Sequence, residues 1–467
     1  MLEAGTPRHA GTTRRTPKAE PHWSLVTAIL GSTMAFVDGT VVNVALPALQ
    51  RDLGGGLTLQ QWVVDAYLLT LGSLILLGGS LGDLFGERRI FSLGTLLFGI
   101  TSVLCAAAPD GNTLIVARGL QGIAGALLTP AALAVITSTF SGEERGAAIG
   151  SWTAWTGISL VIGPLLGGWL VSAASWRAIF ILNVPLVALT LATIAVALPR
   201  RAEGSERAEV DVTGAVLCVL GLGGPVFALI EEPRRGWGDP LILATLCGGL
   251  FLLATFVWWE GHASHPMLPL RLFRSRNFTA ANVETLFAYG ALATLIFFLS
   301  LFLQQLAGYS PFRSGLALLP ITIVMFALSR LSGRLAMRLG PRFFMGAGPI
   351  VCAAGVAWML PLGRHFDYWT ELLPPVLVFA VGLTCLVAPL TSTVLAEAGE
   401  SDAGIASAVN NAVARVAGLI AIAVIGVAVA GPNMELTLHG FRVATALNAV
   451  LLAAAGLTGI AGVRNPR

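Results

Sequence analysis

Charged residues are scarce in this chain. Asp, Glu, Lys and Arg make up 11% of its 467 residues, less than half of the roughly 25% that is typical of soluble domains. The only lysine, Lys18, lies outside any Gly-x-x-x-x-Gly-Lys-[Ser/Thr] loop, which excludes a nucleotide-driven pump. There is also no basic patch interleaved with aromatic residues, so nucleic acid is not an expected partner.

Cysteine pairs and clusters are missing as well. The five cysteines form no CxxC pair and no Cys/His cluster, and each falls in an apolar stretch. We therefore expect neither a disulfide framework nor a metal site, but small buried side chains. The first apolar run is too long for a signal-peptide core and lacks a small-residue cleavage site, so we expect it to be retained as a span.

Apolar residues dominate the rest: 55% of the chain is hydrophobic. They form fourteen stretches of about 20 residues, each long enough for a helix to cross the hydrocarbon core of a bilayer. We place these spans at 24–47, 62–82, 90–108, 113–136, 149–171, 178–198, 212–230, 240–259, 278–303, 315–336, 343–362, 372–395, 404–430 and 441–463. The sequence therefore predicts an all-α polytopic membrane protein.

The basic residues predict its orientation, because Lys and Arg accumulate in cytoplasmic loops. When the loops are assigned to alternate sides, most of the 28 basic residues share the side of the N-terminus. The exceptions outside the membrane are Arg51, Arg177, Arg234, Arg235, Arg313, Arg364 and Arg442. We expect a multi-pass protein of the cytoplasmic (inner) membrane with both termini in the cytoplasm.

One internal repeat predicts the domain organisation. Segment 79–88 follows the second span and segment 333–342 follows the tenth, and both contain glycines seven residues apart. Parallel repeats of this kind are a transporter architecture; the alternative is chance recurrence in a chain with 54 glycines. We expect an N-terminal arm (1–23), a six-helix bundle (24–198), a linker with two inserted helices (199–276) and a second six-helix bundle (277–467).

Three ionisable residues lie deep inside predicted spans: Asp38, Arg118 and Glu284. A charge at that depth costs about 2.5–3.5 kcal/mol on insertion scales and usually faces a partner or a water-filled cavity. A carboxyl group there can take up and release a proton, and a guanidinium, which stays charged, can hold it ionised. The alternatives are a structural hydrogen bond for Asp38, a static ion pair for Arg118 and a side chain that reaches the interface for Glu284.

Two more charged residues are ambiguous. Asp65, near the outer end of the second span, is either a solvated interfacial residue or a coupling site. For Arg415, in the middle of the thirteenth span, we favour structural pairing with backbone carbonyls or another helix. Four aromatic residues near the intramembrane charges are candidates for the apolar wall of a binding site, with ordinary packing as the alternative: Phe36, Trp155, Phe287 and Tyr289.

The fifth span has a run of small residues around a proline: Gly163, Pro164, Gly167 and Gly168. Small residues let helix backbones approach closely, and proline bends a helix by removing one hydrogen bond. This run predicts a tight, bendable packing surface, which any helix bundle could also use for structure alone.

Taken together, these segments resemble the fourteen-span drug–proton antiporter branch of the major facilitator superfamily. The similar segments are Asp38 to Pro47, Gly79 to Arg89, Arg118-x-x-Gln121-Gly122, Gly163-Pro164-x-x-Gly167-Gly168, Trp176-Arg177-x-x-Phe180-x-x-Asn183-x-Pro185 and Gln304-Gln305-x-x-Gly308-Tyr309-Ser310-Pro311. Two positions depart from the pattern. Glu87 stands where a basic residue is usual, and Met337 replaces an acidic residue of the second-half loop.

The resemblance implies a major facilitator fold, with two six-helix bundles plus two inserted helices, that exports lipophilic, often cationic compounds in exchange for protons. Asp38 and Arg118 would couple transport to protons, and Asp38, Glu284 and the four aromatic residues would contact the substrate. Glu284 would share the central cavity with the Asp38 pair. Gating would involve Gly79, Asp83, Gly86, Arg88, Gly163, Pro164, Gly167 and Gly168. No cofactor is expected, and the protein would act as a monomer in the bilayer on small lipophilic substrates and protons.

Two alternatives remain. A dedicated exporter of one endogenous metabolite or antibiotic belongs to the same class. A polytopic membrane enzyme or receptor would need a loop-borne nucleophile, a metal cluster or a sugar-phosphate site, and the short loops show none of these.

Overall fold

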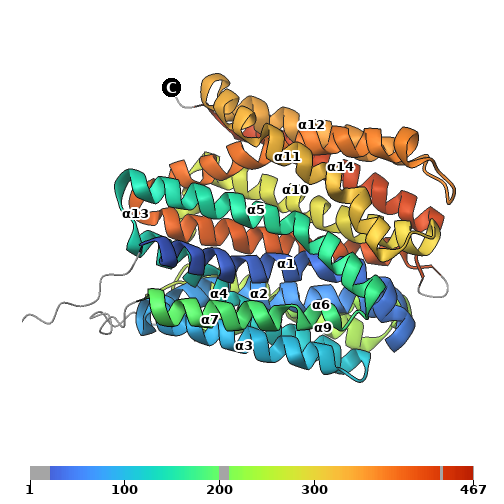
Figure 1. Ribbon diagram of the computed structural model, residues 1–467, viewed down its shortest axis with the longest axis horizontal. Coiled ribbons are helices and arrows are strands. Elements are labelled where there is room, and N and C mark those ends of the chain that lie inside the picture. Colours follow the sequence, from blue (N-terminus) through green and yellow to red (C-terminus); the bar gives the residue numbers. More distant parts are fainter. Residues whose placement is uncertain (1–20, 199–209, 432–434, 466–467) are drawn as a thin grey trace, which may run out of the picture.

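The computed structural model describes residues 21–198, 210–431 and 435–465. Apart from one isolated bridge between Ala430 and Leu436, the regular structure of these residues is helical (Figure 1). The first half of the chain forms α1 (Pro21–Leu53), α2 (Gly56–Phe85), α3 (Glu87–Ala107), α4 (Gly111–Thr139), α5 (Gly142–Ala173), α6 (Ala178–Ile181) and α7 (Asn183–Ala197). The middle forms α8 (Val212–Arg235) and α9 (Pro240–Glu260).

The second half begins with a 3₁₀ turn at Leu270–Arg274 and contains five longer helices. These are α10 (Arg276–Leu301), α11 (Pro311–Leu339), α12 (Pro341–Trp358), α13 (Leu373–Val429) and α14 (Leu438–Gly462). Single π turns, Phe302–Leu306 and Tyr368–Leu372, extend the end of α10 and precede α13.

Twelve helical segments in the described part of the chain are long and apolar enough to cross a membrane. One of them, Tyr368–Glu397, begins in the π turn before α13 and continues into that helix. Another, Gly404–Val429, forms the end of α13. Among the fully described residues of α5 there is a shorter apolar segment, Ile162–Ala173, and the 18-residue α12 is not among the twelve. The predicted all-α multi-pass membrane fold is confirmed, whereas the count of fourteen spans stays a prediction.

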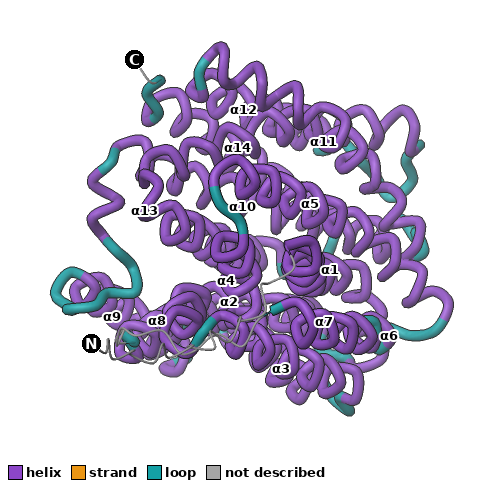
Figure 2. Tube along the Cα trace, turned by 60° about the vertical axis from the view of Figure 1, so that its left-hand side comes forward, coloured by secondary structure: helices purple, strands orange, loops and turns teal. Residues whose placement is uncertain are grey.

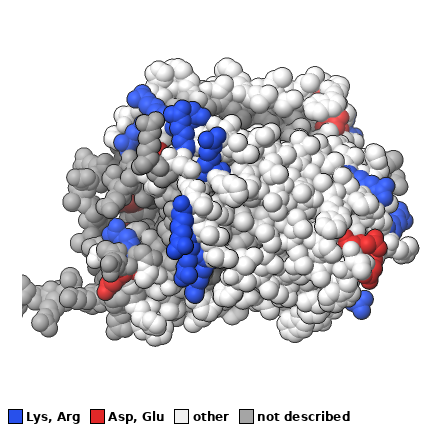
Figure 3. Space-filling model, turned by 90° about the horizontal axis from the view of Figure 1, so that it is seen from above, with Lys and Arg blue, Asp and Glu red and all other residues white. Residues whose placement is uncertain are grey.

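The distribution of charge fits a bilayer. In the face shown in Figure 3, charged side chains lie toward the two ends of the bundle and leave an uncharged belt between them. The apolar belt needs no water because each helix satisfies its own backbone groups. Cys247 is exposed on α9, so the expectation that every cysteine is buried is wrong there; only a small share of the spanning part of α9 is buried inside the protein.

Much of the helix packing lies within each half of the chain. In the first half, α1 packs against α4, α5 and α7, and α4 also contacts α2 and α3. In the second half, α13 packs against α10, α11 and α12, and α14 contacts α10 and α12. α8 and α9 pack against each other, and α8 also touches α2 and α13, one helix from each half (Figure 2).

The two spans of α13 run in opposite directions. Glu397, at the end of the first span, accepts hydrogen bonds from Ser275 and Asn277 at the start of α10. Val429, at the end of the second, packs on Gly440 at the start of α14. Because Arg276 donates to the carbonyl of Gly462 at the far end of α14, Glu397 and Val429 lie at opposite ends of the bundle.

Candidate functional site

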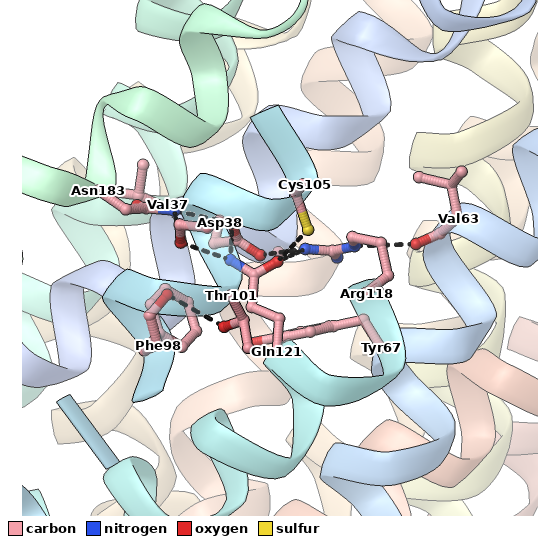
Figure 4. Close-up of polar contacts among 12 residues, drawn as sticks. Val37, Asp38, Val63, Tyr67, Phe98, Thr101, Cys105, Arg118, Gln121 and Asn183 are labelled. Atoms are coloured by element: carbon pink, nitrogen blue, oxygen red, sulfur yellow. Dashed lines mark hydrogen bonds and ion pairs between the residues drawn. The ribbon is translucent and has the colours of Figure 1, made fainter. Parts of the chain in front are cut away.

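A buried ion pair joins α1 to α4. Nη1 of Arg118 lies 2.6 Å from Oδ2 of Asp38 (Figure 4). The two side chains are 1% and 0% exposed. Two charges removed from water are stabilised only when the geometry is good and their other hydrogen-bonding atoms have partners. The surroundings of the pair meet that condition.

Amide and hydroxyl groups satisfy the remaining hydrogen-bonding atoms around the pair. Oδ1 of Asp38 accepts hydrogen bonds from Gln121 (3.0 Å) and Asn183 (3.0 Å), so both carboxylate oxygens are occupied. The same two amides also donate to the hydroxyl of Ser102 on α3. Oε1 of Gln121 in turn accepts from Nη1 of Arg118 at 2.7 Å. The first half thus encloses one connected polar network.

Arg118 is held on its remaining sides by α2 and α6. Its Nε donates to the carbonyl of Val63 (3.0 Å), and its guanidinium carbon lies 4.3 Å from the ring centre of Tyr67. The ring of Phe180 is 5.8 Å away on another side. These contacts would keep Arg118 in place if its bond to Asp38 were lost. The position of Arg118 therefore does not depend on its bond to Asp38 alone.

One short segment positions several parts of this network. In Trp176-Arg177-x-x-Phe180-x-x-Asn183, Phe180 faces Arg118 and Asn183 binds Asp38. Trp176 (2.8 Å) and Arg177 (2.6 Å) both donate to Asp52 near the end of α1. The sequence pattern did not predict these contacts with α1.

Glu284 does not join the pair. It lies on α10 in the second half, is 0% exposed, and neither carboxylate oxygen has a hydrogen-bond partner among the described residues. The alternative that the Glu284 side chain reaches a solvated interface is therefore wrong for this conformation. Its coupling role and its place in a shared cavity stay predictions.

Asp65 and Arg415 differ in burial. Asp65 is also 0% exposed and without a hydrogen-bond partner among the described residues, so its interpretation as a solvated residue is wrong. Arg415 is only partly buried. Its guanidinium carbon lies 5.5 Å from the ring centre of Phe36. The structure shows no hydrogen bond from Arg415 to the described backbone, so of the two forms of structural pairing that we favoured, only the contact with another helix, α1, is present.

The other predicted wall residues are dispersed. Phe287 and Tyr289 of α10 pack at the edge of the core of the second half. Trp155 on α5 is 54% exposed. Phe36 lies beside an intramembrane charge, and that charge is Arg415.

The turn between α2 and α3 connects α3 to the end of α7. Gly86 adopts a positive φ of 91°, which favours glycine at the bend. Arg88 donates to the carbonyls of Leu198 and Ala195 at the end of α7. Asp83 is exposed, and Gly79 is in ordinary contact with Pro130 of α4. Their roles in gating stay predictions.

The glycines of α5 face both halves. A Cβ at Gly163 or Gly167 would collide with Thr40 or Val41 of α1. A Cβ at Gly168 would lie 2.6 Å from the carbonyl oxygen of Pro311 on α11. On the α11 side, Gly315 approaches Pro164 in the same way. The small-residue surface predicted for the fifth span is therefore a contact between the halves as well as within one.

Hydrogen bonds join the halves at the end where α1 stops and α2 begins, which we call the closed end (residues 43–61 and 300–315). The carbonyls of Asn43 and Val44 accept from Ser300 (3.1 Å) and Gln304 (3.0 Å) of the second half. Oε1 of Gln50 accepts from both Gln60 and Gln305, each at 2.8 Å.

Two further features lie at or near the closed end. Gln61 donates to the carbonyl of Ile422 on α13 at 3.0 Å. Tyr309 lies in the connection between α10 and α11, where burial raises the pKa of its hydroxyl.

Comparison with known proteins identifies the fold. The family model described as Major Facilitator Superfamily matches residues 28–422. The chain belongs to the major facilitator superfamily. It is 35% identical over 452 residues to a puromycin resistance protein of Streptomyces alboniger, covering 92% of this chain and 89% of that protein.

Other proteins are similar to this chain to a comparable degree. A methylenomycin A resistance protein of Bacillus subtilis is 35% identical over 407 residues, covering 86% of each chain. A probable actinorhodin transporter of Streptomyces coelicolor is 32% identical over 438 residues, covering 91% of this chain and 75% of that one. The crystal structure of a peptide transporter, POT, in complex with sulfate superposes with a TM-score of 0.70 over 94% of each chain at 16% identity. That likeness supports the fold alone.

Proposed function

We propose that this protein is a proton-driven exporter of small lipophilic molecules, antibiotics among them, that works by alternating access. The observation that carries the proposal is the enclosed Asp38–Arg118 pair. An intramembrane carboxylate with a permanent cation beside it is a site for proton-dependent switching. Membership of the superfamily and relatives named for antibiotic resistance support export.

Coupling would run along α1. Protonation of Asp38 removes the charge that holds Arg118, while Gln121 and the carbonyl of Val63 retain the guanidinium. The carbonyls of Asn43 and Val44, between one and two turns further along α1, accept the hydrogen bonds that close one end of the passage. A small displacement of α1 would therefore act on the proton site and the closed end together.

The membrane potential supplies the driving force in this scheme. One charge moving across the membrane releases about 2.3 kcal/mol per 100 mV. At about 1.4 kcal/mol per tenfold ratio, one proton could sustain a gradient of roughly fiftyfold for a neutral substrate. We further propose the fourteen-span branch, cytoplasmic termini in the inner membrane, a monomer and no cofactor. With this orientation the closed end faces outward.

The test is efflux from inside-out vesicles with and without collapse of the proton gradient. Asp38→Asn should abolish gradient-dependent transport while the protein still accumulates in the membrane. Asp110→Asn is the matched control, because Asp110 is an exposed residue that caps α4 and asparagine caps equally well. Unchanged transport by Asp38→Asn would remove this carboxylate from the mechanism.

A dedicated exporter of one compound is the second candidate. It is favoured by the names of two relatives, which each refer to resistance to a single antibiotic, puromycin or methylenomycin A. A panel of dyes and antibiotics competing for efflux separates the two: inhibition by one chemical class indicates a dedicated exporter, and inhibition by many indicates a multidrug pump. A membrane enzyme or receptor is not supported by the family.

A further inference from the structure

Among the charged side chains inside the described spans and away from their ends, the carboxylates are buried and a cation is accessible to a transported molecule. Asp38, Asp65 and Glu284, the carboxylates inside described spans away from the ends, are each 0% exposed. Both oxygens of Asp38 are already occupied by hydrogen bonds from Arg118, Gln121 and Asn183. In this conformation none of the three can meet a cationic substrate.

Arg415 is different because it lies between the halves and keeps its charge uncompensated. It belongs to the second span of α13, and a Cβ on Gly72 of α2 would lie 3.1 Å from the Cβ of Arg415. No described carboxylate lies within salt-bridge distance of its guanidinium. The side chain is partly exposed.

The neighbourhood of Arg415 has an aromatic surface and free volume. Its guanidinium stands over Phe36 on α1. Gly39 lies three residues further on, and positions i and i+3 share one face of a helix. A Cβ on Gly39 would meet no atom within 4 Å, so the face of α1 that carries Phe36 borders open space.

We propose that Arg415 and Phe36 form a recognition site for flat aromatic substrates that carry an acidic oxygen, such as a carboxylate, a phenolate or an enolate. The guanidinium donates paired hydrogen bonds to such oxygens. The Phe36 ring offers an apolar face to the rest of the molecule. A cationic substrate would be repelled by the same group, because no accessible carboxylate offsets its charge. The proposed substrates are therefore a narrower class than the lipophilic, often cationic compounds that the resemblance implied.

The inference rests on the proposed function only for the direction of transport, so its test measures binding without any gradient. The full chain is purified in detergent, and fluorescence polarisation follows two flat dyes with the same xanthene core: fluorescein, which is anionic, and pyronin Y, which is cationic. The wild-type protein should bind fluorescein more tightly than pyronin Y. Arg415→Gln should weaken fluorescein binding at least about tenfold, as expected for the loss of hydrogen bonds to a charged group, and leave pyronin Y unchanged or tighter.

Two further variants separate recognition from folding. Arg415→Lys keeps the charge but loses the paired hydrogen bonds, so it should bind fluorescein more tightly than Arg415→Gln and less tightly than the wild type, whereas Arg415→Glu should reverse the preference toward pyronin Y. Size-exclusion profiles identical to wild type show that each variant is folded. The proposal is overturned if wild-type protein does not bind fluorescein, if it prefers pyronin Y, or if Arg415→Gln weakens both dyes equally. Binding through Arg415 in a protein without proton-dependent efflux would leave this inference standing and remove the proposed function.

Discussion

The two halves of the chain surround their buried charges differently. In the first half, Asp38 and Arg118 are enclosed by partners from neighbouring helices. In the second half, Glu284 is buried without a hydrogen-bond partner among the described residues, and Arg415 is partly exposed beside an aromatic ring. A saturated network suits a switch that must keep its shape when one proton is added. A charged side chain without a fixed partner is suited to reversible contact with a transported molecule.

The largest expected effect comes from breaking the enclosed pair. Arg118→Met should lower the free energy of unfolding by about 3–5 kcal/mol, because it leaves a buried carboxylate without its counter-charge. Unfolding of the purified protein in mixed detergent micelles measures the change. Adding Asp38→Asn to the same chain should recover part of the loss. A double variant as unstable as the sum of the two single variants would contradict a coupled pair.

The next effect concerns the contact between the halves. Gly168→Val would push its side chain into Pro311 and Phe312 of α11 and should loosen the closed end at a cost of about 1–3 kcal/mol. A cysteine introduced at Ser300, which is fully buried, reports the loosening by faster reaction with an impermeant maleimide. Gly150→Val is the control on the same helix, because a Cβ at Gly150 meets nothing within 4 Å. Equal labelling rates in both variants would show that Gly168 is not part of the seal.

A smaller effect distinguishes the charged network from a neutral one. Asn183→Ala removes a hydrogen bond to ionised Asp38 and should cost about 1.5–3 kcal/mol. Asn410→Ala in the second half removes bonds to the neutral side chains Asn282 and Thr285 and should cost about 0.5–1.5 kcal/mol. Both are measured by unfolding in micelles. If the order were reversed, the Asp38 network would not be the stronger of the two.

The smallest effect on stability is expected at Glu284. Glu284→Gln removes no hydrogen bond seen in the structure, so the free energy of unfolding should change by less than about 0.5 kcal/mol or become more favourable. A loss as large as that of Arg118→Met would show that this carboxylate has a strong partner, and the contrast between the halves would disappear.

The sequence was sufficient for the class of fold and for the residues of the ion pair. Apolar run lengths alone placed the helices, and Asp38 and Arg118 stood out because charges are rare at that depth. Gln121 was open to prediction, since it follows Arg118 by three residues and shares its helix face. Asn183 was visible as a polar residue within an apolar span.

Other features needed the three-dimensional structure. The bond between Gln305 and Gln50 joins residues 255 positions apart, and nothing local in either segment specifies that pairing. The burial of Asp65 depends on α8 and α13 packing over α2, which a span boundary does not reveal. The position of Arg415 in the middle of a predicted span marked it as an unusual residue. That position could not distinguish a partner on another helix from the open space beside Phe36 and Gly39.

The most direct test of proton coupling through Asp38 follows protons rather than substrate. In proteoliposomes loaded with a pH-sensitive dye, addition of a transported compound to the wild-type protein should move protons in the opposite direction to that compound. With Asp38→Asn the compound should still exchange down its own gradient while the dye signal stays flat. Proton movement of wild-type size in Asp38→Asn would contradict the account.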